Sequence, residues 1–225
     1  MRLLITGFGP FPRVPRNPTE AYARALAADP RWRRLGIEAR ALVLPTTYGA
    51  VDQILLPALA REPWDAVLML GVAARRHRIT PEIRAVNRVT RRLPDASGRL
   101  PESLSYRPGA PFALRARMPI APLLAAMRAA APRRASVASS RDAGRYLCNA
   151  ASYAALALEG GPAALVFVHV PMPRGLPTPW LGGPAGRTRP DARETLRVLR
   201  AAALALAAAA RKPSRDRLRR SPSAA

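Results

Sequence analysis

Apolar and polar residues alternate along this chain of 225 residues in blocks that predict interleaved strands and helices. Short apolar runs rich in branched residues predict buried strands, and longer segments with apolar positions three and four apart predict amphipathic helices. The predicted strands cover residues 2–6, 38–44, 66–70, 82–89, 135–139 and 163–171. The predicted helices cover residues 19–28, 49–61, 120–131, 149–158 and 191–210.

This alternation predicts an α/β fold, a three-layer α/β/α sandwich with a mostly parallel central sheet. We expect one domain over residues 1–210, which is long enough for a substantial core. The polar, proline-rich residues 91–111 predict a loop. Pro173–Pro190 is dense in proline and glycine, and we expect it outside the compact fold, as a flap or a surface connection. Arg211–Ala225 carries six basic residues and one acid, which predicts a disordered tail.

The charge is strongly basic, with 37 lysine and arginine residues, 14 acids and a net charge of +23. Such a balance raises the possibility of a protein that binds polyanions. The charge is spread along the chain, however, and no zinc-finger spacing or helix-turn-helix pattern accompanies it. We therefore expect weak, salt-sensitive adhesion to polyanions and no specific nucleic-acid partner.

The single cysteine, Cys148, changes the picture most. One cysteine forms no intramolecular disulfide and no four-cysteine zinc site, so Cys148 is either a buried inert thiol or a nucleophile. It lies where a loop meets a predicted helix, and the positive end of the helix dipole favours the thiolate there. This position favours the nucleophile.

A cysteine nucleophile needs a base, and the chain has two histidines, His77 and His169. His169 ends an apolar strand that stops at Pro171, and catalytic groups of open α/β sheets gather at the carboxyl ends of strands. His77 lies among arginines, which disfavour a protonated imidazole, and we expect a solvated loop residue. Glu82, at the start of another predicted strand, is the candidate to orient His169.

Four segments together resemble pyroglutamyl peptidase I, or pyrrolidone-carboxylate peptidase, a family of cysteine peptidases. The cysteine and histidine segments carry most of the resemblance, which extends over Arg2–Pro171. The segments are Thr6–Phe11 with Asn17–Thr19, Gly71–Asn87, Ala143–Asn149 and Phe167–Pro171. The resemblance implies a phosphorylase/hydrolase-like fold and a catalytic triad of Glu82, Cys148 and His169.

The resemblance also implies the reaction and its partners. The expected substrates are peptides with an amino-terminal pyroglutamate, cleaved through a thioester, with no metal or organic cofactor. Phe8 and Phe11 match the loop that holds the lactam ring, and Asn17 and Arg76 are further candidates for substrate binding. Family members are often tetramers, so a homo-oligomer is expected.

The sequence departs from the family pattern at two glycine pairs. Pro12-Arg13 and Ala74-Arg75 stand where the family has glycines, and glycine serves where the backbone needs close approach or positive φ. Altered specificity or lost activity is therefore one alternative. Another is an enzyme like a nucleoside phosphorylase, with Arg75 and Arg76 in a phosphate loop, although that reaction gives Cys148 no role.

The expected compartment is the cytoplasm. The apolar stretch after Met1 is too short for the core of a signal peptide, and no apolar run is long enough to span a membrane. A free catalytic thiol also suits a reducing compartment.

Overall fold

A computed structural model of the chain describes residues 1–12, 14–133, 135–178, 183–184 and 189–211, with only the backbone described at 177–178 and 183–184. Five strands form the main sheet in the order β2-β1-β3-β7-β4. Four of them run parallel: β1 (Arg2–Phe8), β2 (Glu38–Leu44), β3 (Ala66–Val72) and β7 (Ala164–Val170). The edge strand β4 (Thr80–Pro81) is antiparallel to β7. The mostly parallel sheet predicted from the sequence is confirmed.

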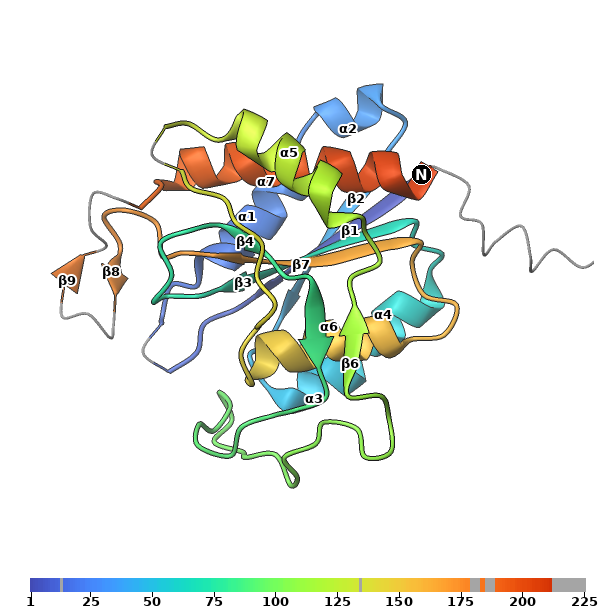
Figure 1. The fold of residues 1–225 in the computed structure, drawn as a ribbon, viewed down its shortest axis with the longest axis vertical. Helices are drawn as coiled ribbons and strands as arrows, with labels where there is room; N and C mark the ends of the chain where they lie inside the picture. The colour runs from blue at the N-terminus through green and yellow to red at the C-terminus, as the bar shows by residue number, and fades with distance from the viewer. Residues whose placement is uncertain (13, 134, 179–182, 185–188, 212–225) are drawn as a thin grey trace, which may run out of the picture.

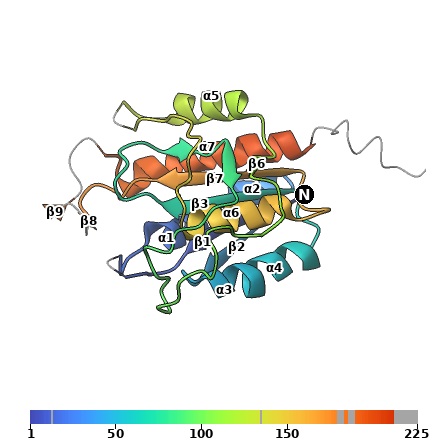
Figure 2. The same cartoon turned by 60° about the horizontal axis from the view of Figure 1, so that its bottom comes forward.

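Helices cover both faces of this sheet and make the three predicted layers (Figures 1 and 2). One face is covered by α1 (Pro18–Ala27), α5 (Ile120–Ala130) and α7 (Ala192–Arg211), with the short α2 (Arg31–Arg34) beside them. The other face is covered by α3 (Tyr48–Ala50), the π-helical turn Val51–Leu55, α4 (Leu56–Arg61) and α6 (Leu147–Ala157).

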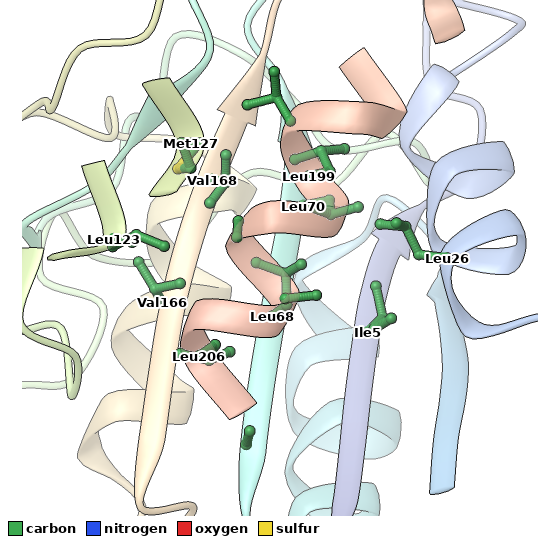
Figure 3. Close-up of a cluster of buried hydrophobic side chains, with 14 of the residues drawn as sticks. Ile5, Leu26, Leu68, Leu70, Leu123, Met127, Val166, Val168, Leu199 and Leu206 are labelled. Atoms are coloured by element: carbon green, nitrogen blue, oxygen red, sulfur yellow. The ribbon is translucent and has the colours of Figure 1, made fainter. Parts of the chain in front are cut away.

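The two faces separate because successive side chains of a strand point in opposite directions. Figure 3 shows Ile5, Leu68 and Val166 meeting Leu199 and Leu206 of α7 on one face. Their neighbours in sequence face the other layer. These include Leu4, Val67, Met69, Leu165 and Phe167, which pack with residues of α6.

Several elements differ from the prediction. The helix expected at residues 49–61 is interrupted by a π-helical turn, because Pro57 has no N–H to donate back along the helix. The strand expected at 135–139 makes a single isolated bridge, from Val137 to Ile79. The helix α2 and the strand β6 (Ala113–Arg115) were absent from the prediction.

The strand expected at residues 82–89 is shorter and leaves the main sheet. Only β5 (Arg84–Val86) is regular there, and it pairs with β6 in a separate two-stranded sheet. Glu82 lies between β4 and β5, and its N–H still donates to the Phe167 carbonyl of β7 at 2.8 Å. The chain therefore turns away from the central sheet immediately after Glu82.

The segment Pro173–Pro190 is partly integrated into the fold, which corrects the prediction. Its described residues include the backbone of a small hairpin, β8 (Pro177–Thr178) and β9 (Gly183–Pro184). Arg189 at its end is fully buried and donates from Nη1 to the Ala74 carbonyl at 2.8 Å. Residues 179–182 and 185–188 lie outside the described residues, as does the predicted tail beyond Arg211. No helix among the described residues is both long and apolar enough to cross a membrane.

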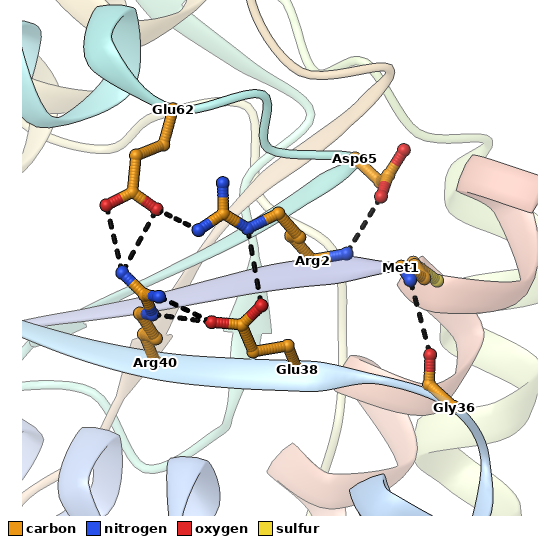
Figure 4. A network of polar contacts seen from close by, with 7 residues as sticks. All are labelled: Met1, Arg2, Gly36, Glu38, Arg40, Glu62 and Asp65. Atoms are coloured by element: carbon orange, nitrogen blue, oxygen red, sulfur yellow. Dashed lines mark hydrogen bonds and ion pairs between the residues drawn. The ribbon is translucent and has the colours of Figure 1, made fainter.

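Ionic contacts join the strands at their amino-terminal ends (Figure 4). Arg2 of β1 pairs with Glu38 and Glu62, and Arg40 of β2 pairs with the same two carboxylates. The Arg2 N–H donates to Asp65 at 2.8 Å. This network lies at the end of the sheet opposite to the residues with candidate chemistry, which leaves the carboxyl ends of β1, β3 and β7 for the site.

Candidate active site

Glu82 and His169 form a buried, directly bonded pair at the carboxyl end of β7. The Nδ1 of His169 lies 2.7 Å from Oε1 of Glu82, and the two residues are 4 % and 1 % exposed. An ionised carboxylate only accepts hydrogen bonds, so Nδ1 carries the proton and donates it to this bond. The remaining ring nitrogen, Nε2, is then unprotonated and available as a base.

Cys148 is the second residue of α6 and lies over β3, the strand beside His169. An ideal Cβ built on Gly71 would come within 2.8 Å of the Cys148 sulfur and 2.6 Å of the Phe167 ring. Gly71 is also the register partner of His169. The sulfur therefore occupies space that only a glycine leaves open, directly over the pair of strands that carries the histidine.

The helix start of Cys148 is confirmed, yet the thiolate is not favoured there at rest. Burial, reinforced by the negative charge of Glu82, raises the pKa of the Cys148 thiol to about 12. The backbone N–H of Cys148 and the charge of Arg76 lower this pKa, but by less. Burial likewise lowers the pKa of His169 against the opposing effect of Glu82. The resting pair near neutral pH is thus a neutral thiol and a neutral imidazole.

Glu82 stays ionised in spite of its burial. Burial alone would raise its pKa, but hydrogen bonds from His169 and Ser140 and the charges of His169 and Arg76 lower it below the ordinary value of 4.5. An ionised Glu82 stabilises an imidazolium at His169 when a proton arrives there. The ionised carboxylate therefore suits His169 to accept a proton.

The first turn of α6 supplies backbone donors next to the sulfur. Tyr146, the residue before the helix, provides no side-chain cap, so the first N–H groups of α6 are not used by a capping side chain. A helix start also carries partial positive charge. These amides are the natural place for an oxyanion that forms when Cys148 attacks a carbonyl.

The other predicted site residues have different surroundings. Phe8 ends β1, is 2 % exposed and belongs to the same apolar cluster as Leu147 and Cys148. Phe11 is partly exposed and packs on a smaller cluster with Ala74. Asn17 caps α1 by accepting from the Thr19 N–H, and its side chain donates to the Gly9 carbonyl at 3.0 Å. Asn17 therefore shapes the loop after β1.

Arg76 lies beside Glu82. Its Nη1 donates to Oε1 of Glu82 at 2.6 Å and to Thr80 at 2.5 Å, while Nη2 donates to the Asp142 carbonyl at 2.5 Å. His77 is exposed and apart from this cluster, in agreement with the expected solvated residue.

Sequence reasoning missed two residues that assemble the site. Asn149 accepts from the Val86 N–H and donates to the carbonyls of Val86 and Arg88, which fastens the cysteine helix to the segment after Glu82. Its signal in the sequence was an asparagine within an otherwise largely apolar helical run, and the structure shows that its side chain is fully buried. Gly71 was part of a recognised segment, but its close approach to the sulfur requires the three-dimensional arrangement.

Of the two replaced glycine pairs, Ala74-Arg75 directly precedes Arg76. Ala74 is buried against Val14 and Met172, and Arg75 is exposed on the turn that leads to Arg76. Arg13 lies outside the described residues. Among the described residues, no group of three or more histidine, cysteine or acidic side chains is placed to hold a metal ion.

The family model for pyroglutamyl peptidase matches residues 1–202. The chain belongs to the pyroglutamyl peptidase family. The pyrrolidone-carboxylate peptidase of Thermococcus kodakarensis is 34 % identical over 174 residues, which cover 76 % of this chain and 81 % of the relative. That of Gloeobacter violaceus is 36 % identical over 174 residues, 76 % of this chain and 82 % of the relative.

Solved structures of the family have the same fold. The pyrrolidone carboxyl peptidase of Thermus thermophilus is 35 % identical and superposes with a TM-score of 0.75, covering 91 % of this chain and 99 % of that structure. A mutant pyrrolidone carboxyl peptidase of Pyrococcus furiosus is 28 % identical and superposes with a TM-score of 0.79, covering 92 % of this chain and 99 % of that structure. Membership of a peptidase family also decides against the phosphorylase and polyanion-binding alternatives as the main function.

Proposed function

We propose that the protein is a cysteine exopeptidase that removes an amino-terminal pyroglutamyl residue from peptides, with Cys148, His169 and Glu82 as its catalytic triad. Membership of the pyroglutamyl peptidase family supports the reaction. The observation that carries the assignment of residues is the 2.7 Å bond between Glu82 and His169, beside a sulfur lodged over Gly71.

The reaction begins from the neutral pair. His169 Nε2 takes the proton of Cys148 while the sulfur attacks the carbonyl carbon of the pyroglutamyl residue, and Glu82 stabilises the imidazolium that results. The imidazolium then protonates the leaving amine as the C–N bond breaks, which leaves a thioester on Cys148. A water molecule, deprotonated by His169, attacks the thioester and releases pyroglutamate and the free thiol.

The binding groups follow from the surroundings of the sulfur. Backbone N–H groups in the first turn of α6 stabilise the oxyanion. Phe11 is the more accessible of the two predicted phenylalanines and is our candidate for contact with the lactam ring, with Phe8 packing beneath the loop. Asn17 acts through the loop it holds at Gly9.

Hydrolysis of pyroglutamyl-aminomethylcoumarin tests this function. The wild-type chain should release the fluorophore, EDTA should leave the rate unchanged, and Cys148→Ala and His169→Ala should be nearly inactive. His77→Ala is the matched control, because His77 is the other histidine and is exposed. A folded wild-type protein without turnover would contradict the proposed substrate, and an active Cys148→Ala would contradict the nucleophile.

We also propose a cytoplasmic homo-oligomer whose residues 1–210 form the catalytic domain. The unpaired thiol of Cys148 suits a reducing compartment, which supports the location. Light scattering coupled to size-exclusion chromatography measures the oligomeric state. A chain that ends at residue 211 should keep the full specific activity, since α7 ends there.

A further inference from the structure

We propose that Arg76 is a positioning residue of the triad: it holds the Glu82 carboxylate in place and joins it to the segment that leads into the cysteine helix. This inference rests on the proposed triad. It differs from the role of substrate ligand that the sequence predicts for Arg76, because Nη1 and Nη2 of its guanidinium both donate to protein acceptors.

The first observation is a shared oxygen. Oε1 of Glu82 accepts from both Arg76 Nη1, at 2.6 Å, and His169 Nδ1, at 2.7 Å, whereas Oε2 is buried without a hydrogen-bond partner. Rotation of the carboxylate would exchange the two oxygens, and the bond from Arg76 to Oε1 opposes that rotation independently of the histidine. Arg76 therefore fixes the acceptor that orients the imidazole.

The second observation is that Arg76 reaches the other side of the site. Nη2 donates to the Asp142 carbonyl at 2.5 Å and lies 3.4 Å from the Ser140 hydroxyl. Asp142 in turn accepts from the N–H of Gly144, whose φ of 79° turns the chain toward α6 and Cys148. One guanidinium thus connects the acid of the triad with the approach to its nucleophile.

The third observation is electrostatic. The charge of Arg76 opposes that of Glu82, and it lowers the pKa of both Glu82 and His169. Loss of this charge should raise the pKa of His169, so that the imidazole becomes protonated at a higher pH. A residue that only braces the fold would not move this titration.

The titration of His169 tests the inference without relying on turnover. The chain has two histidines, so the imidazole signals in an NMR titration are assigned with His77→Gln, and exposed His77 serves as the internal reference. In Arg76→Met the midpoint of His169 should rise by roughly half to one pH unit. The matched control is Arg78→Met, which removes an exposed arginine of the same loop. In this variant the midpoint of His169 should not change.

Kinetics separate positioning from substrate binding. Arg76→Met should lower kcat by up to about 100-fold with KM unchanged, because a small misplacement of a catalytic group has an effect of this size. The acidic limb of the pH profile of kcat/KM should move to higher pH. Arg76→Lys keeps the positive charge but lacks the two-pronged guanidinium group. It should retain the acidic limb of the wild-type kcat/KM profile and recover only part of kcat.

Three results would overturn the inference. They are a raised KM with unchanged kcat in Arg76→Met, an unmoved His169 midpoint in that variant, and full activity in both variants. If Arg76→Met does not fold, Arg76→Lys decides. A wild-type kcat in that variant would mean that the guanidinium geometry is not needed to position Glu82. A wild-type protein without turnover contradicts the proposed function instead, and the His169 titration then still reports on Arg76.

Discussion

Cys148 shows how two local effects compete for one side chain. Its position in the first turn of α6 favours a thiolate, whereas burial and the charge of Glu82 favour the thiol and raise its pKa to about 12. The effect of burial is the larger one because the sulfur lies close against the backbone of Gly71, although the residue as a whole is only partly buried. In the proposed mechanism the nucleophile is therefore generated during attack, when His169 receives the proton.

We predict that the alkylation rate of Cys148 by iodoacetamide will rise about tenfold per pH unit from neutral pH to about pH 10, without a plateau, because only the thiolate reacts. Mass spectrometry measures labelling, and the loss of activity should match it. Free cysteine, whose pKa is about 8.5, is the control and should level off within this range. A plateau below pH 8 for Cys148 would instead indicate a preformed thiolate–imidazolium pair.

Glu82→Gln keeps the size of the side chain and removes its charge. We predict a fall in kcat on the order of 10²- to 10⁴-fold with little change in KM, because the imidazolium loses its stabilisation and the amide permits the wrong tautomer. Adding this change to His169→Ala should cost little more, since members of one catalytic unit are not additive. A wild-type kcat in folded Glu82→Gln would mean that another carboxylate orients His169.

At the scale of elements, the sequence predicted what depends on local pattern. The buried strand of His169 and the helix of Cys148 both follow from apolar runs and their boundaries, and the structure has them at Ala164–Val170 and Leu147–Ala157. The triad order came from the family resemblance. The 2.7 Å bond between Glu82 and His169 agrees with it.

Non-local pairing explains what the sequence did not predict. The strand β6 has only three residues and forms because β5 lies beside it. The strand expected after Glu82 ends early because Asn149, far along the chain, takes the hydrogen bonds of Val86. The contacts of Arg76 also depend on distant segments coming together. The sequence therefore predicted a substrate ligand, whereas in the structure Arg76 donates to Glu82.

The contact between β3 and α6 makes Gly71 a sensitive position. We predict that Gly71→Ala will displace the Cys148 sulfur or the Phe167 ring, because the added Cβ would lie 2.8 and 2.6 Å from them. Overpacking of this kind typically costs about 1–3 kcal/mol of unfolding free energy, and kcat should fall with it. Chemical denaturation and the pyroglutamyl assay measure both effects.

The matched control is Gly49→Ala in α3, where an added Cβ meets only the Gln53 side chain at 3.8 Å or more. This variant should keep its activity and its stability, since alanine favours a helix. If Gly71→Ala is as stable and as active as Gly49→Ala, the sulfur is not held against β3 in the way that the close contact implies.

At the scale of the whole molecule, the net charge of +23 acts on every substrate that approaches. The field of a basic protein concentrates anionic ligands and raises their association rates, and salt screens this effect. Exposed Arg75, on the turn beside the site, adds a local contribution where the family has glycine. Selectivity for acidic peptides should therefore depend on ionic strength.

We predict that kcat/KM for a pyroglutamyl peptide with Glu in the second position will exceed that of its Gln counterpart at low salt. The ratio should approach one as the ionic strength rises from about 0.01 M to about 1 M, because the screening length falls from ~30 to ~3 Å. The Gln peptide is the matched neutral control. In Arg75→Met the preference should weaken but persist, since the other basic residues maintain the field. A preference that salt does not change would require a direct contact with the glutamate, and a ratio of one at low salt would mean that the field does not reach the second residue of the substrate.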